Sequence, residues 1–81
     1  MKKKQVLEII ERGWSIFEFS YNEKDCSIDP YFDKKLNRQV YHLYCDGQEL
    51  IVFSVDEAMN TPFFDGKPLN EIAELITDIY Y

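Results

Sequence analysis

The residues that could carry out nucleophilic chemistry are two cysteines, Cys26 and Cys45, and a single histidine, His42. A cysteine attacks as the thiolate, which a nearby histidine and carboxylate help to generate. Cys45 and His42 lie three residues apart in a segment with a strand pattern, so their side chains point to opposite faces and cannot meet. Cys26 falls in a polar segment of unknown position. Packing as small apolar side chains explains both cysteines more simply.

Metal and cofactor sites require residue sets that this sequence lacks. One histidine and two cysteines roughly twenty residues apart do not supply a zinc site. The stretch Asp25–Asp29 has oxygen-bearing side chains at the first three ligand positions of an EF-hand calcium loop. Pro30 then stands where that loop needs glycine, and Leu36 where it needs glutamate. No glycine-rich phosphate loop is present. We therefore expect no metal, no cofactor and no enzymatic activity.

Negative charge is concentrated in the second half of the chain. The sequence has 15 Asp and Glu against 9 Lys and Arg, a net charge of −6. From Asp46 to Tyr81 the only basic side chain is that of Lys67, whereas residues 1–45 are nearly balanced. Such a field attracts basic partners and repels nucleic acid and anionic lipid. We therefore expect a partner with a basic protein surface and no membrane docking.

The expected partner-binding residues belong to this acidic half. They are Asp56, Glu57, Asp65, Glu71, Glu74, Asp78, Phe63 and Phe64. Gathered into one patch, the carboxylates would speed encounter with a lysine- and arginine-rich surface, and the phenylalanines would supply affinity. The alternative is that the carboxylates only solvate a helix face. At least one of Phe63 and Phe64 is also expected to close the core.

One segment combines basic and aromatic side chains, namely Tyr31, Phe32, Lys34, Lys35, Arg38 and Tyr41. Such side chains can stack on and neutralise a single-stranded nucleic acid. Asp29 and Asp33 interrupt the segment, and a phosphate backbone would have to pass the acidic half. Direct nucleic-acid binding is therefore not expected.

Size and composition predict a single folded domain over residues 1–81. A chain of this length cannot support two cores, and 46% hydrophobic with 16% aromatic residues is too apolar for a disordered acidic tail. A secretory signal needs an apolar stretch after its basic start, and here Glu8 and Glu11 interrupt that stretch, which argues against such a signal. Two free thiols are typical of a reducing compartment, so we expect a cytoplasmic protein.

Helical spacing of apolar residues predicts a helix over residues 3–12, and alternation predicts a strand over 14–21. Charges and Pro30 break the pattern from Asn22 to Asn37, so we expect a long loop there. Two β-rich runs then flank Asp46-Gly47, which predicts a hairpin with a type I′ turn. That turn sets the register, with Leu43 opposite Leu50 and His42 opposite Ile51.

Ser54 and Glu57 have the spacing of a capping box, which predicts a short helix over 55–60. Pro68 suits the first turn of a last helix, in which apolar residues recur as far as Ile79. The expected class is α+β: a three-stranded antiparallel sheet with an N-terminal helix and C-terminal helices on one face, in the order α-β-β-β-α-α.

The other face of this sheet would carry apolar side chains, those of Ile16, Val40, Ile51 and Phe53. A monomer rarely leaves so much contiguous apolar area in water. Either the loop over 22–37 covers this face, or the face is an interface, for example in a symmetric homodimer.

Two C-terminal stretches, Phe53–Asn60 and Phe64–Ile72, resemble the C-terminal part of short proteins carried by phages and mobile elements of Gram-positive bacteria. The resemblance implies an accessory protein and brings no active site with it. Among phage accessory products, small acidic α+β anti-CRISPR proteins are similar in size and charge, and they occupy basic nucleic-acid-binding surfaces of their targets.

The leading hypothesis is a non-catalytic acidic interaction module, one form of which is a phage-type inhibitor that docks on a basic, nucleic-acid-binding protein surface. The alternative is a small structural or assembly protein that homodimerises through its exposed sheet face.

Overall fold

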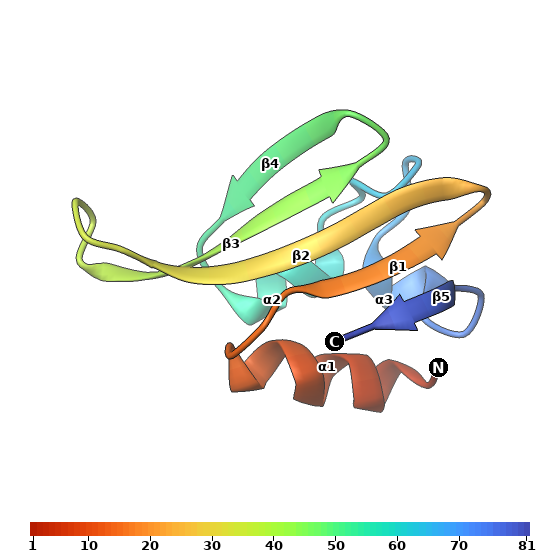
Figure 1. Ribbon diagram of the computed structural model, residues 1–81, viewed down its shortest axis with the longest axis horizontal. Helices are drawn as coiled ribbons and strands as arrows, with labels where there is room; N and C mark the ends of the chain where they lie inside the picture. The colour runs from red at the N-terminus through yellow and green to blue at the C-terminus, as the bar shows by residue number, and fades with distance from the viewer.

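The computed structural model describes residues 1–81, and its central element is an antiparallel five-stranded sheet with the strand order β4-β3-β2-β1-β5 (Figure 1). The strands are β1 (Phe17–Tyr21), β2 (Lys24–Asp33), β3 (Arg38–Cys45), β4 (Gln48–Val52) and β5 (Thr77–Tyr80), and the helices are α1 (Lys3–Arg12), α2 (Val55–Asn60) and α3 (Leu69–Ile72). The class is α+β as expected. The prediction of a three-stranded sheet is wrong, because β2 and β5 add two strands.

Helix α1 forms where the helical spacing predicted it. Its buried side chains, Val6 and Ile10, are one turn apart on the face that meets the core. Gly13 ends the helix with φ 64°, a left-handed conformation that favours glycine, and its N–H donates to the Ile10 carbonyl at 3.1 Å.

The hairpin of β3 and β4 also forms as predicted. Asp46 and Gly47 have φ of 49° and 87°, and a type I′ turn needs positive φ at both of its central residues. Leu43 pairs with Leu50 and His42 with Ile51, which is the expected register.

The segment predicted to be a long loop is largely strand β2, which lies at the centre of the sheet. β2 pairs with β1 on one side and with β3 on the other. Asn22 and Glu23, both with positive φ, connect β1 to β2 as a two-residue turn. The local pattern is short: polar and apolar residues alternate from Asp25 to Asp29, but Pro30 then interrupts a run rich in Asp, and backbone pairing on both sides outweighs the low strand propensity of these residues.

Pro30 is tolerated in this central strand because of where its nitrogen points. In a strand, the backbone N–H and C=O groups of successive residues point alternately to the two neighbouring strands. Asp25 points its carbonyl towards the β3 side, where it accepts from the Asp46 N–H, and Pro30 is an odd number of residues further along. The Pro30 nitrogen therefore points towards β1. β1 begins at Phe17, opposite Ile28, so no carbonyl of β1 stands across from Pro30.

The C-terminal helix is shorter than the apolar spacing suggested. It ends at Ile72, and the Leu75 N–H donates to the Ile72 carbonyl at 2.8 Å in the turn that follows. The chain then forms β5 along the free edge of β1, with Glu18 opposite Tyr80. Pairing with β5 satisfies backbone N–H and C=O groups at the edge of β1, which would have no partner strand if the helix continued.

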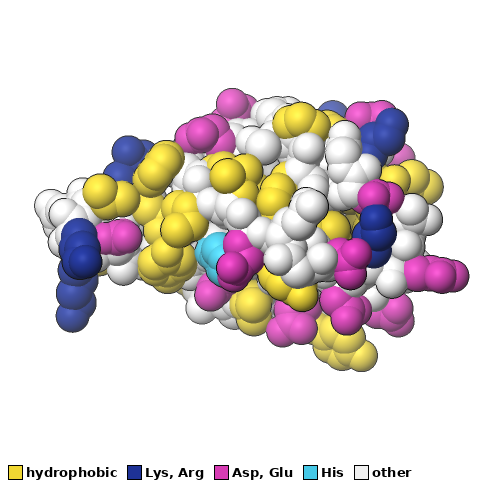
Figure 2. Space-filling view, turned by 90° about the horizontal axis from the view of Figure 1, so that it is seen from above, with side chains coloured by type: hydrophobic (Ala, Val, Ile, Leu, Met, Phe, Trp, Pro, Cys, Tyr) yellow, Lys and Arg dark blue, Asp and Glu magenta, His cyan; other side chains and the backbone are white.

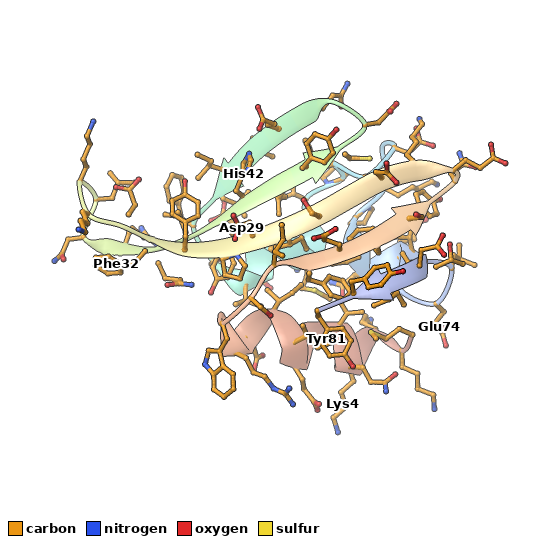
Figure 3. All side chains as sticks on the ribbon, viewed as in Figure 1. Lys4, Asp29, Phe32, His42, Glu74 and Tyr81 are labelled. Atoms are coloured by element: carbon orange, nitrogen blue, oxygen red, sulfur yellow. The ribbon has the colours of Figure 1, made fainter.

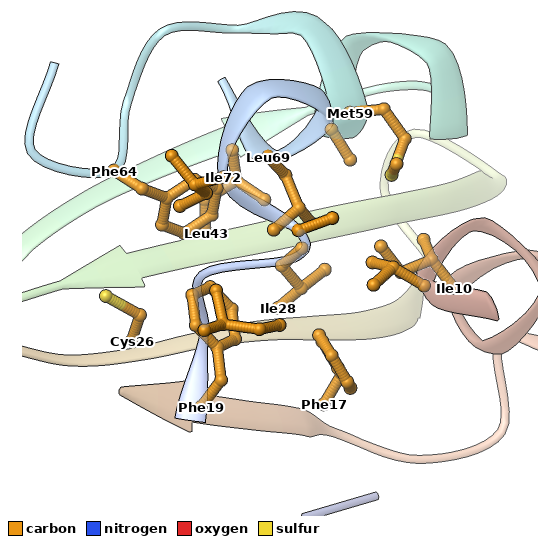
Figure 4. Close-up of a cluster of buried hydrophobic side chains, with 14 of the residues drawn as sticks. Ile10, Phe17, Phe19, Cys26, Ile28, Leu43, Met59, Phe64, Leu69 and Ile72 are labelled. Carbon is orange, nitrogen blue, oxygen red and sulfur yellow. The ribbon is translucent and has the colours of Figure 1, made fainter. Parts of the chain in front are cut away.

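All three helices pack on one face of the sheet, as expected, and the hydrophobic core lies between the two layers (Figures 1 and 4). Ile10 of α1, Met59 of α2 and Leu69 of α3 are buried there. They meet the strand side chains Phe17, Phe19, Ile28 and Leu43. No helix has the length and apolar character needed to span a membrane.

Candidate interaction surface on the open face of the sheet

The face of the sheet that the helices leave uncovered is the candidate functional site, and we call it the open face. Side chains alternate between the faces of a strand, so residues next to core positions lie on it. They are Glu18, Ser20, Asp25, Ser27, Asp29, Tyr31, Asp33, Arg38, Val40, His42, Tyr44, Glu49 and Ile51, followed by Phe53 just after β4.

One end of the open face is apolar, and we call Tyr31, Val40, Ile51 and Phe53 the apolar half. Val40 lies opposite Tyr31 and is 0% exposed, although it is outside the core cluster. Ile51 and Phe53 remain 45% and 41% exposed. The space-filling view shows hydrophobic side chains gathered between the β2–β3 hairpin and the histidine (Figure 2). This arrangement offers anchors that a partner could bury.

Arg38 borders the apolar half and is held by Phe53. Its guanidinium carbon lies 5.2 Å from the centre of the Phe53 ring, and its Nη2 donates to the Phe53 carbonyl at 2.7 Å. A cation over an aromatic face is favourable. Arg38 is therefore fixed to the protein's own surface.

His42 stands in the middle of the open face between two carboxylate-bearing strands. Its Nε2 lies 3.1 Å from Glu49 Oε1, and it is directly opposite Asp29 on β2 (Figure 3). Cys45 points instead into the core, as the alternation predicted. An imidazole held beside the Glu49 carboxylate in this way can serve as a polar contact.

The other end of the open face contains an acidic hollow beside the edge strand β5. Its lining residues are Glu18, Phe19, Ser20, Asp25, Cys26, Asp78 and Tyr80, and its volume is about 430 Å³. It lies where the pairing of β1 with β5 shifts register between Glu18 and Ser20. The three carboxylates have no basic side chain among the lining residues. A lysine or arginine from another protein would complement them.

A second hollow, of about 220 Å³, lies beside the β3–β4 turn, and we call it the turn cleft. Its lining residues are Lys24, Cys45, Asp46, Gln48, Asp65 and Gly66. Lys24 Nζ lies 2.5 Å from Asp65 Oδ1, and Asn22 Nδ2 donates to Asp65 Oδ2 at 2.8 Å. The hydrogen bond from Lys24, with that from Asn22, lowers the pKa of Asp65, and the same contact raises the pKa of Lys24. This carboxylate is therefore already neutralised.

The predicted partner-binding residues do not form one patch. Asp56 and Glu57 open helix α2 near the end of β4, where Glu57 Oε1 accepts from the Phe53 N–H at 3.2 Å. Asp65 binds Lys24 at the opposite end of the sheet, next to the β1–β2 turn. Glu71 pairs with Lys67 at 3.5 Å. Glu57, Asp65 and Glu71 thus already have partners within the chain.

The remaining predicted residues are placed differently. Glu74 and Asp78 are exposed and take part in no ion pair, and Asp78 lines the acidic hollow. Phe64 is 0% exposed and packs against Phe19, with ring centres 5.3 Å apart, so it has no surface to offer a partner. Phe63 is half-buried, edge-on to Phe64. Phe64 therefore closes the core, as was expected of at least one of these two phenylalanines.

Glu18 and Asp25 were not among the predicted binding residues, because they belong to the nearly neutral half of the chain. The alternation in residues 17–21 did place Glu18 away from the core. Asp25 could have been placed on the same face by the alternation of polar and apolar residues from Asp25 to Asp29, but that segment was predicted to be a loop.

Comparison with known proteins gave no relative: no family model, no curated protein and no solved structure matches the chain. The fold places the chain in the α+β class, and a fold class by itself does not define a function.

Proposed function

We propose that this chain is a non-catalytic, cytoplasmic interaction module whose open face docks on a basic protein surface. The observation that carries the proposal is the acidic hollow, where Glu18, Asp25 and Asp78 converge without a basic side chain. An inhibitor that occupies the nucleic-acid-binding surface of its target is one form of this function, and the resemblance to phage accessory proteins favours it. Direct binding of nucleic acid is disfavoured because the same carboxylates repel phosphate.

The two ends of the open face would contribute differently to binding. The carboxylates of the hollow would attract and orient a lysine or arginine, and the 69%-exposed ring of Tyr80 offers that cation an aromatic wall. Most of the affinity would come from burying Tyr31, Ile51 and Phe53, because a few desolvated aromatic and aliphatic side chains supply most of the binding energy of an interface. Charge would select the partner, and the apolar half would hold it.

Two doubly substituted variants with the same change in net charge test the proposal. The probe is a pentapeptide of alternating arginine and lysine, titrated by calorimetry at low ionic strength. We expect Asp25→Asn with Asp78→Asn to weaken binding by about tenfold, since two carboxylates of the hollow are lost. Asn also tolerates the positive φ of Asp78, 50°.

The matched control is Asp56→Asn with Glu71→Gln, which removes two carboxylates that lie outside the hollow. We expect this variant to bind the peptide within about twofold of the original chain, because only net charge has changed. An equal loss in both variants would contradict the proposal, since binding would then follow net charge and not the hollow.

A second candidate function, homodimerisation through the apolar half, is favoured by the exposed side chains of Ile51 and Phe53. A symmetric dimer would bury this patch against itself. Sedimentation equilibrium should then show a dimer that Ile51→Glu dissociates. Leu75→Glu, a change at a 64%-exposed leucine outside the open face, should leave the dimer intact. A monomer at all concentrations would exclude this candidate.

A further inference from the structure

The two cysteines, which the sequence left unrelated, meet across the sheet. Cys26 of β2 lies directly opposite Cys45 of β3, and their Sγ atoms are 3.0 Å apart. Both residues are 3% exposed and point into the core side of the sheet. Both are free thiols.

Their position in the ladder suits a covalent bond. The Asp46 N–H donates to the Asp25 carbonyl at 3.0 Å, so the neighbouring pair, Cys26 and Cys45, occupies a non-hydrogen-bonded position. Cα atoms at such positions are about 4.5 Å apart, which lies within the range that disulfides span. The two sulfur atoms can therefore approach without moving the strands.

We propose that Cys26 and Cys45 form an oxidisable dithiol that a low-molecular-weight disulfide converts into a cross-strand disulfide. One thiolate attacks the small disulfide and releases the first small thiol, leaving a mixed disulfide. The second cysteine then displaces the other small thiol as the Sγ–Sγ bond forms. Two protons and two electrons pass from the cysteines to the small disulfide, which leaves as two thiols.

A small reagent can approach the pair from the turn cleft, which includes Cys45 among its lining residues. Burial first, and then the hydrogen bond with Cys45, raise the pKa of the Cys26 thiol. Little thiolate is present at neutral pH, so the reaction is slow and speeds up as pH rises.

The bond would change stability and leave the open face as it is. It would close a loop from Cys26 to Cys45, which contains most of the β2–β3 hairpin, and so restrict the unfolded chain. Both sulfur atoms lie on the core side, away from the residues of the open face. The inference is therefore independent of the proposed function and is tested separately.

The test is to incubate the folded protein with oxidised glutathione at mildly alkaline pH, block free thiols with N-ethylmaleimide, and measure the intact mass under denaturing conditions. We expect the loss of two hydrogen atoms, no maleimide and no glutathione. The midpoint of thermal unfolding should rise by about 10 °C and return on reduction with dithiothreitol.

Cys45→Ser and Cys26→Ala provide controls, since each leaves one thiol that can carry only a glutathione or a maleimide. Retention of two maleimides or two glutathiones by the original chain, or a disulfide-linked dimer, would overturn the proposal. The decisive measurement uses the unsubstituted protein, so it holds even where a variant does not fold.

Discussion

At the scale of single residues, the partners of each carboxylate decide how much negative charge the surface displays. Asp65 is held by Lys24 and Asn22, whereas Glu18, Asp25 and Asp78 have no basic neighbour in the hollow that they share. A paired carboxylate adds little to the outward field, because its partner cancels it. The unpaired carboxylates therefore define the surface that a basic partner would encounter.

The Lys24–Asp65 pair predicts a pH dependence of stability. The pKa of Asp65 is lowered in the folded state, so its contribution is complete above the pKa of the unfolded chain and is lost as pH falls through the folded pKa. The pKa of Lys24 is raised, so its contribution is present below its unfolded value and is lost as pH rises through its folded value.

Thermal unfolding of Asp65→Asn and the original chain, followed by circular dichroism from pH 7 down to about pH 2, would measure this dependence. We expect the variant to unfold a few degrees lower near pH 7, since this exposed pair contributes little. The difference should vanish in acid. A difference that stays constant down to the lowest pH would show that the pair does not carry the effect.

At the scale of elements, tight turns with positive φ fix the register that places acidic and apolar side chains on the open face. Asp46 and Gly47 form such a turn between β3 and β4, and an added Cβ on Gly47 would meet no atom within 4 Å. The cost of a side chain at Gly47 is therefore conformational alone.

We predict that Gly47→Ala lowers the free energy of unfolding by about 1 kcal/mol, because alanine disfavours positive φ. Gly47→Asn should recover part of this loss, since asparagine adopts the left-handed conformation more readily. Urea unfolding would measure both. Equal stability of Gly47→Ala and the original chain would contradict the assigned turn.

The elements that the sequence predicted well carry strong local signals, and those that it missed do not. Asp46-Gly47 between two β-rich runs and the apolar spacing of α1 are sufficient on their own. Strand β2 alternates polar and apolar residues only from Asp25 to Asp29 and then contains Pro30, and pairing on both sides extends its strand conformation beyond that short pattern. β5 continues an apolar helical spacing, but pairing with the edge of β1 decides its conformation.

The candidate site was predicted only in part for the same reason. Asp78 could be named from the acidic half, but its neighbours in the hollow, Glu18 and Asp25, come from strands far away in the sequence. Phe64 looked available because it lies in a turn, yet it packs against Phe19. Assembly of the sheet, and not local pattern, brings the hollow together.

At the scale of the whole molecule, charge is divided along the strands. The β2–β3 hairpin carries Lys34, Lys35 and Arg38 at one end, and Asp25, Asp46 and Asp78 lie at the other. The long dimension is 35 Å, several times the screening length of roughly 8 Å at physiological salt. A partner would therefore meet a basic hairpin end and a predominantly acidic end, where Lys24 is paired with Asp65, as separate fields with the open face between them.

The measurement that tests the central claim most directly is a map of backbone amide shifts in ¹⁵N-labelled protein titrated with the arginine–lysine pentapeptide. We predict that the largest shifts fall on β1, β5 and the start of β2 around Asp25, which surround the acidic hollow. Shifts strongest on α2 and α3, around Asp56 and Glu71, or spread evenly over all carboxylates, would contradict docking through the open face.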